Sequence, residues 1–397
     1  MVRKPQAGDS VMTPRTYRWL DRICRPIQWI VGFATGLGSY VLCTIAVGNA
    51  WRLGPILPIL VVTLFGLATT IIHELGHYAA ARWAGMTVMH VRFGSIEVIP
   101  QQQGWRVRWN AQQKIRVGGF VVAACDPRRP MRPQALCLVA GGPLANLVAV
   151  AIFVVLANVW PSAVAGPLLW TCATLNAGVA LGNLLPTSRG KGTDGMRLLT
   201  WAPKDVESDP RLVYLRLQAL SMAGVTADRL PGDQIAALES MAIPMPLIAL
   251  WYRLKAHQNR GEWQSAAQLR ETYESLMQAL PDTARPKMVA ANAVLRTELA
   301  FAEAMQSGDA SGLTDGLLPK ATAWLVPSLW PRCLALRAIL AGNIVEAERL
   351  LDETKRYAEQ SMDKALPKSE ALIRAYMLSL PVDGIPLLRD VACNEAG

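Results

Sequence analysis

Long apolar runs alternate with short polar connections along the first 185 residues of the chain. The runs cover residues 27–50, 55–81, 133–159 and about 163–185. Each is close to or longer than the roughly 20 apolar residues that a helix needs to cross a bilayer. The pattern therefore predicts about four transmembrane helices. The first run is too long for the core of a cleavable signal peptide, and no Ala-x-Ala site follows it.

The connection between the second and third runs has a different pattern. Apolar and polar side chains alternate after Thr87 and again from Trp105 to Trp109, and residues 100–104 between them are turn formers. This alternation is typical of strands, so we expect a β-hairpin associated with the membrane edge. Residues 115–124 are expected to continue from it as a short segment packed against the helices.

The remainder of the chain resembles a soluble helical protein. From Arg211 onward, apolar residues recur at spacings of three and four. Residues 261–266 and 342–347 are similar to each other, and residues 301–313 form a weaker copy between them. Such helix–turn–helix repeats predict a TPR-like solenoid, and an irregular helical bundle is the alternative. We expect this domain to bind or regulate through a protein partner.

The predicted fold is thus an all-α polytopic membrane protein with a membrane-associated β-hairpin and a soluble α-helical domain. The expected divisions are a cytoplasmic N-terminal segment at residues 1–26, a transmembrane core at 27–202 and a cytoplasmic helical domain at 203–397. Composition agrees, because the chain is 52% apolar and only 18% charged, whereas soluble domains contain about 25% charged residues.

The net charge of +10 is explained by orientation in a membrane. Basic residues concentrate before residue 27, between 82 and 132, and after 185, whereas the connection 51–56 carries only Arg52 and the link near Pro161 carries none. Positive charge marks the cytoplasmic side of a membrane protein. We therefore expect an integral protein of a bacterial inner membrane with both termini cytoplasmic. Basic and aromatic residues are not interleaved as in single-strand-binding proteins, so we expect no nucleic-acid partner.

The second apolar run ends in the sequence His-Glu-Leu-Gly-His, residues 73–77. Histidines four residues apart lie on one face of a helix and can bind one zinc ion together, with the intervening Glu74 as general base. A catalytic zinc site usually has a third protein ligand. His90 and His257 are weaker candidates, because one lies on the hairpin and the other lies in the soluble domain. Asp194 is preferred, since it follows the fourth apolar run at the same membrane depth as His73 and His77.

These motifs together resemble the site-2 protease family, the M50-like intramembrane zinc metalloproteases. The resemblance is carried by residues 73–77, by Gly-Pro-Leu-Ala-Asn at 142–146, by Asn-Leu-Leu-Pro at 183–186 and by Asp194-Gly195. It implies one zinc ion per chain on His73, His77 and Asp194. Asn146 and Asn183 are candidates for orienting the substrate. Two features depart from the family pattern: Thr193 replaces the usual leucine, and residues 187–192 lengthen the path to Asp194.

The expected function is endoproteolysis of transmembrane segments of other membrane proteins by zinc-activated water. Glu74 would accept the proton of the water and deliver it to the leaving amine. An exposed edge of the hairpin would align the unwound substrate as a strand. The alternative is a non-proteolytic membrane scaffold that binds client proteins through its helical domain. The intact Glu74 disfavours the scaffold, because binding alone requires no general base.

Overall fold

The computed structural model describes residues 18–48, 56–110, 118–188 and 192–380. The described residues divide into two compact units. One unit holds the chain up to Leu212 except residues 101–103, and the other holds those three residues and the chain from Val213 onward. Each unit is described by itself below.

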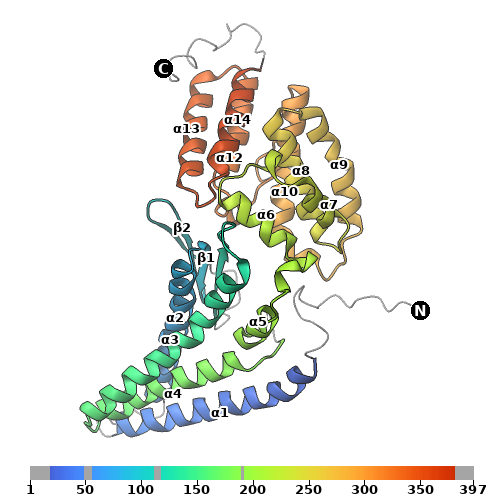
Figure 1. The fold of residues 1–397 in the computed structure, drawn as a ribbon. Coiled ribbons are helices and arrows are strands. Elements are labelled where there is room, and N and C mark those ends of the chain that lie inside the picture. Colours follow the sequence, from blue (N-terminus) through green and yellow to red (C-terminus); the bar gives the residue numbers. More distant parts are fainter. Residues whose placement is uncertain (1–17, 49–55, 111–117, 189–191, 381–397) are drawn as a thin grey trace. The chain divides into compact units, whose positions relative to one another are not determined.

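The first unit is built on long helices that run side by side (Figure 1). They are α1 (Arg18–Gly48), α2 (Ile56–Trp83), α3 (Met131–Val159) and α4 (Ala165–Leu184). All four predicted apolar runs are therefore helical over nearly all of their described residues, and α1 begins earlier than predicted, at Arg18 instead of residue 27. The helices α1, α2 and α3 are long and apolar enough to cross a membrane.

The helix α4 differs from these three in its surroundings. It packs against α1, α2 and α3, and its polar residues Thr171 and Asn176 are buried. A helix enclosed by other helices can keep polar side chains that lipid would not tolerate, provided that they find hydrogen-bond partners. A fourth membrane crossing at α4 remains a prediction.

The outward faces of α1, α2 and α3 are strongly apolar. Large apolar side chains are exposed along each of these helices, for example Phe33 on α1, Leu64 on α2 and Val155 on α3. Apolar surface of this extent is unfavourable in water. It suits a hydrocarbon environment, which supports the expectation of a membrane protein.

A small sheet follows α2. Its strands are β1 (Thr87–Phe93), β2 (Ile96–Pro100), β3 (Trp105–Trp109) and β4 (Gly119–Ala124), arranged antiparallel in the order β3-β2-β1-β4. The predicted single hairpin needs correction. Gly94 has a φ of 55°, a conformation that favours glycine, and it turns the chain so that residues 87–100 form two strands. The predicted continuation includes β4, which pairs with β1, while residues 111–117 lie outside the described part of the chain.

The sheet is attached to the end of α2 that carries the His-Glu-Leu-Gly-His sequence. Met86, Val88, Val91 and Val98 are buried together with Ala81 of α2 in one apolar cluster. Because β4 is joined to β1, this cluster also fixes β4 beside α2. The short helix α5 (Asp194–Trp201) then packs against α3 and α4.

Helices are the only regular secondary structure in the described residues of the second unit. They are α6 (Val213–Met222), α7 (Gly232–Glu239), α8 (Met245–Arg260), α9 (Trp263–Gln278), α10 (Val289–Ser307), α11 (Lys320–Ala323), α12 (Leu329–Leu340), α13 (Ile344–Gln360) and α14 (Leu366–Leu378). The pairs α8–α9 and α12–α13 turn at Gly261 and Gly342, with φ values of 70° and 74°. Helix pairs thus occur at both predicted places, but after α10 a loop precedes α11. A TPR-like solenoid remains a prediction.

A buried group of charged residues joins four helices of this unit. Arg332 of α12 pairs with Glu298 of α10 and, at 2.8 Å, with Glu370 of α14. Lys255 of α8 lies 3.3 Å from the same Glu298. All four side chains are buried. Burial opposes the ionisation of Glu298, yet the charges of Arg332 and Lys255 outweigh it and lower the pKa of Glu298 to about 2.

Candidate metal centre

The helix α2 presents His73, Glu74 and His77 toward the interior of the first unit. All three side chains are buried. The neighbouring helix α3 approaches very closely here, because a Cβ atom at Gly76 would lie 2.4 Å from the Gly141 carbonyl oxygen. Glycine at both positions permits backbone contact between the two helices. A Cβ atom at Gly142 would lie 2.4 Å from His77 Nε2, so the glycine also keeps space free at the histidines.

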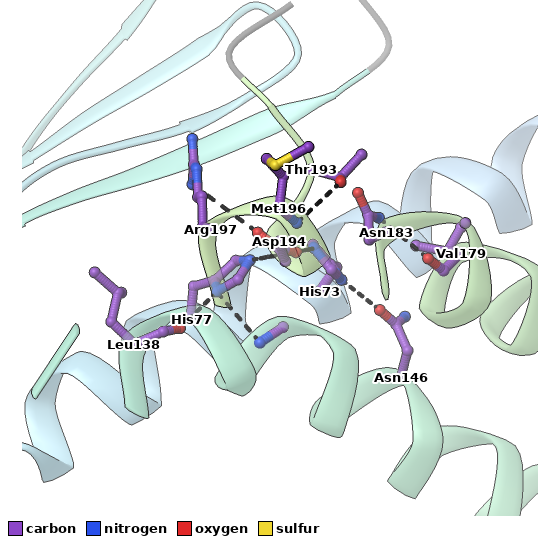
Figure 2. Close-up of polar contacts among 12 residues, drawn as sticks. His73, His77, Leu138, Asn146, Val179, Asn183, Thr193, Asp194, Met196 and Arg197 are labelled. Atoms are coloured by element: carbon purple, nitrogen blue, oxygen red, sulfur yellow. Dashed lines mark hydrogen bonds and ion pairs between the residues drawn. The ribbon is translucent and has the colours of Figure 1, made fainter. Parts of the chain in front are cut away.

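Asp194, the first residue of α5, completes a group of three possible metal ligands (Figure 2). Its Oδ2 atom lies 3.0 Å from His73 Nε2 and 3.3 Å from His77 Nε2. The two histidine Nε2 atoms are 3.2 Å apart. Ligand atoms about 2.0–2.2 Å from a tetrahedral zinc ion are separated by about 3.3 Å. The three donors therefore fit one zinc ion and leave a fourth position open.

Two neighbours of Asp194 explain how α5 begins at this place. Thr193 caps the helix, because its hydroxyl accepts a hydrogen bond from the Met196 backbone N–H at 3.4 Å. A Cβ atom at Gly195 would lie only 1.9 Å from the Leu184 carbonyl oxygen. The close approach of α5 to the end of α4 therefore requires glycine after Asp194.

The surroundings of Asp194 favour its ionised form. Burial opposes ionisation, but the hydrogen bonds of His73 and His77 outweigh burial and hold the pKa of the Asp194 carboxyl well below its usual value. Arg197 adds a longer contact, 3.9 Å from Asp194 Oδ1. A carboxylate is the form that can ligate a metal ion.

Glu74 lies beside the three ligands without joining them. Its Oε2 atom is buried and has no hydrogen-bond partner among the described residues. The first residue of β4 packs against it, because a Cβ atom at Gly119 would lie 2.5 Å from Glu74 Cγ. A buried carboxylate oxygen without a protein partner is unfavourable unless a water or substrate binds it. This arrangement suits a base that receives a proton from bound water.

The comparisons with known proteins agree with this geometry. Residues 60–165 match the description of peptidase family M50. This segment is therefore similar to that family. The family resemblance expected from the motifs is therefore confirmed for this part of the chain, which includes His73, Glu74 and His77 but ends before Asp194.

A relative with a descriptive name was also found. A Rhizobium meliloti (strain 1021) protein, provisionally named a zinc metalloprotease, is 30% identical over 159 residues. The match covers 33% of this chain and 41% of that relative, so it leaves more than half of the relative's length unmatched. No solved structure matches the chain.

Within the matched segment, Asn146 lies against His73, one of the possible metal ligands. Its Oδ1 atom accepts a hydrogen bond from His73 Nδ1 at 2.6 Å, and its Nδ2 atom donates to Asn176 Oδ1 at 2.7 Å. Asn176 donates in turn to Thr69 Oγ1 at 3.3 Å. Such a contact fixes which ring nitrogen carries the proton and leaves His73 Nε2 for a metal ion. The predicted role in orienting substrate has no support from this contact.

Asn176 was not among the predicted site residues. The available signal was an asparagine in the middle of an apolar helix, where an unpaired amide is costly. Its burial and its bond to Asn146 now explain its presence in α4.

The second histidine of the M50 segment is oriented by the backbone of α3. His77 Nδ1 donates to the Leu138 carbonyl oxygen at 2.7 Å. Pro143 lies within α3, where proline removes a backbone donor and loosens the preceding turn. Both histidines therefore direct Nε2 toward Asp194.

The remaining sequence candidates lie apart from the three ligands. Asn183 donates to the Val179 carbonyl of its own helix at 3.1 Å. His90 on β1 packs against the ring of Phe120 at 5.1 Å between centroids. His257 belongs to the other unit and pairs with Glu262 at 2.6 Å. None of these three side chains joins His73, His77 and Asp194 in the group of possible ligands.

Proposed function

We propose that the chain is an intramembrane zinc endopeptidase. The observation that carries this proposal is the convergence of His73, His77 and Asp194 with their donor atoms about one tetrahedral edge apart, beside the buried Glu74. The M50 match and the apolar helices support it. Activity, substrate class and a location in the bacterial inner membrane are all part of the proposal.

The chemistry divides between the ion and the side chains. A zinc ion held by His73, His77 and Asp194 would polarise the scissile carbonyl and lower the pKa of water. Glu74 receives the water proton on its unpartnered carboxylate oxygen and passes it to the nitrogen of the leaving amine. Asn146 and the Leu138 carbonyl hold the two histidine rings in place during these steps.

The substrate is proposed to be a membrane-spanning segment of another protein, unwound at the site. A helix shields its peptide bonds, so cleavage needs a locally extended chain. The strand β4 is the last in the order β3-β2-β1-β4, and its other edge has no strand partner among the described residues. Because Gly119 at the start of β4 packs against Glu74, a substrate strand added to this edge would pass close to the base.

The scaffold alternative makes a different demand on Glu74. A scaffold gains nothing from a buried carboxylate, and burying one without a hydrogen-bond partner for Oε2 destabilises the fold. The position of Glu74 beside three possible ligands therefore favours the peptidase.

The decisive experiment compares the parent protein with two variants in detergent. The parent should bind about one zinc ion per chain and cut a helix-destabilised membrane segment. Glu74→Gln should retain zinc and fold but lose turnover, because an amide cannot accept the proton. Asp194→Ala should lose both zinc and activity. Near-normal cleavage by Glu74→Gln, or full zinc binding by Asp194→Ala, would contradict the proposed roles.

We further propose that the second unit recruits or regulates substrates. The possible ligands and Glu74 all precede residue 213, and helix pairs such as α8–α9 commonly build binding surfaces. A chain ending after Leu212 should still bind zinc and cut a model segment in detergent, but should cut its natural client poorly in cells. Loss of all cleavage by a truncated chain that still folds and binds zinc would assign the second unit to the catalytic machinery.

A further inference from the structure

Hydrogen bonds between Thr187 and Thr193 join the two ends of the connection that leads to Asp194. The Thr193 hydroxyl donates to the Leu185 carbonyl oxygen at 2.6 Å and accepts from the Thr187 backbone N–H at 3.1 Å. The Thr193 backbone N–H donates to the Thr187 carbonyl oxygen at 3.0 Å. Residues 187 and 193 therefore lie side by side, whatever path the chain takes between them. A leucine at position 193 could not make the hydroxyl contacts.

The helix α1 also forms hydrogen bonds with the start of this connection. Gln28 accepts a hydrogen bond from the Thr187 hydroxyl at 3.2 Å and donates to the Gly182 carbonyl oxygen at 2.9 Å. Asp21 accepts from both the backbone N–H and the hydroxyl of Ser188, at 2.8 and 3.0 Å. Thr187 is fully buried. Two side chains of α1 thus hold the two residues that follow the α4 helix and its proline.

These contacts belong to one polar stripe on a largely apolar helix. Asp21, Gln28 and Thr35 are spaced by seven residues, which places them on one face of α1. Thr35 faces Gly178 of α4 so closely that a Cβ atom at Gly178 would lie 2.1 Å from its hydroxyl oxygen. The opposite face carries exposed apolar residues such as Ile30 and Leu37. Polar residues on a helix of this kind are unfavourable unless they are bonded within the protein.

We infer that α1 is a positioning helix of the metal centre, with Gln28 and Asp21 as positioning residues for Asp194. The contacts form a continuous path from Gln28 to Thr187, from Thr187 to Thr193, and from Thr193 to the adjacent Asp194. Without the hydrogen bonds from Gln28 and Asp21, the connection has more conformations available. The Asp194 carboxylate is then held less firmly at His73 and His77. The inference rests on the proposed role of Asp194 as a zinc ligand.

The test measures zinc affinity of the full-length protein by competition with a chelator. Gln28→Leu and Thr187→Val remove the hydrogen bonds at nearly constant volume, and each should weaken zinc binding on the order of 10-fold. Thr187→Ser restores the hydroxyl and should bind zinc nearly as the parent does. Leu37→Ala, on the exposed face of α1, is the matched control and should bind zinc as the parent does. The double variant of Gln28 and Thr187 should be little weaker than the weaker single variant, because both changes remove the same contact.

A second readout separates positioning from general support of the fold. Cobalt in place of zinc reports the coordination geometry through its visible absorption, which should change in Gln28→Leu and remain unchanged in Leu37→Ala. Asp21→Ala, at the end of α1 beyond the apolar stretch, provides an independent variant should Gln28→Leu fail to fold, and should weaken zinc binding in the same direction.

The outcomes distinguish this inference from the proposed function. Parent-like zinc affinity and cobalt spectra in Gln28→Leu and Asp21→Ala would overturn the inference and leave the peptidase proposal intact. A loss of thermal stability in these variants with unchanged zinc affinity would likewise overturn it, because it would show a purely structural role. If the parent protein binds no zinc, or if Asp194→Ala binds zinc as tightly as the parent, both the proposed function and the inference are overturned.

Discussion

At the scale of single residues, the centre depends on which atom of each histidine is free. Both rings have one nitrogen engaged by the protein, His73 by the Asn146 side chain and His77 by the Leu138 carbonyl. The engaged Nδ1 atoms carry the protons, so both Nε2 atoms remain available next to Asp194. The groups that hold the rings therefore support the centre by orienting its candidate ligands.

Asn146 offers a direct test of this view. Asn146→Ala should weaken zinc binding roughly 10- to 100-fold, because His73 loses the contact that orients its ring. Asn183→Ala is the matched control: its amide bonds to its own helix, so zinc affinity should stay at the parent value. Zinc titration by chelator competition measures both. Equal zinc affinity in the two variants would show that Asn146 does not orient the ligand.

At the scale of elements, small residues set the distances between the parts of the centre. Glycine allows α3 to touch α2 at Gly76 and Gly141, allows β4 to reach Glu74 at Gly119, and allows α5 to reach α4 at Gly195. Each contact leaves no space for a Cβ atom. A larger residue at one of these glycines would therefore push two elements of the centre apart and shift a candidate ligand or Glu74.

Gly119→Ala should displace Glu74 and lower the rate of cleavage by about 10-fold or more, because misplacing a catalytic group by about 1 Å is costly. Zinc content should stay near that of the parent, since the ligands come from other elements. Gly66→Ala is the control on α2, where a Cβ atom would meet nothing within 4 Å. A kinetic assay on the same peptide compares the three proteins. Unchanged activity in Gly119→Ala would show that β4 does not constrain the base.

The buried charges of the second unit are a further test at this scale. Arg332→Ala leaves Glu370 buried without its basic partner and leaves Glu298 with Lys255, and should destabilise the unit by about 3–5 kcal/mol. Arg337→Ala on the same helix breaks only a contact with the largely exposed Asp315 and should cost about 0–1 kcal/mol. Denaturant-dependent proteolysis of the second unit measures the difference. Similar stability of the two variants would mean that the charged group contributes little.

At the scale of the whole molecule, orientation in the membrane is the main open expectation. The distribution of basic residues predicts that the link near Pro161 lies outside the cell and that the sheet, the candidate metal centre and the second unit lie inside. The apolar outer faces of α1, α2 and α3 agree with a membrane setting, but they do not indicate which ends of the helices face the cytoplasm.

Cysteine labelling in intact cells determines the sidedness. A reagent that does not cross membranes should label Ala163→Cys, in the link between α3 and α4. It should not label Arg128→Cys, before α3, or Gln264→Cys in the second unit, until the cells are opened. Labelling of Gln264→Cys in intact cells would reverse the proposed orientation.

The sequence by itself determined the helices, the candidate ligands and the family resemblance. Long apolar runs can form little except helices in a membrane, and two histidines four residues apart on such a helix share one face because of its geometry. These features are local, so they can be read without the fold. The preference for Asp194 over His90 and His257 also followed from the order of the apolar runs, and the structure brings that carboxylate to the two histidines.

Only the tertiary structure decided how these parts are held. Asn146 bonds to His73, Asn176 extends that contact, and Gln28 of α1 reaches the connection before Asp194. The partners in these pairs are separated by 30 to 159 residues along the chain. Hydrogen bonds between distant residues depend on which helix faces meet, and the spacing of apolar residues within one helix does not specify this. The same reason explains the extra strands, since the pairing of β4 with β1 depends on the apolar cluster beneath the sheet.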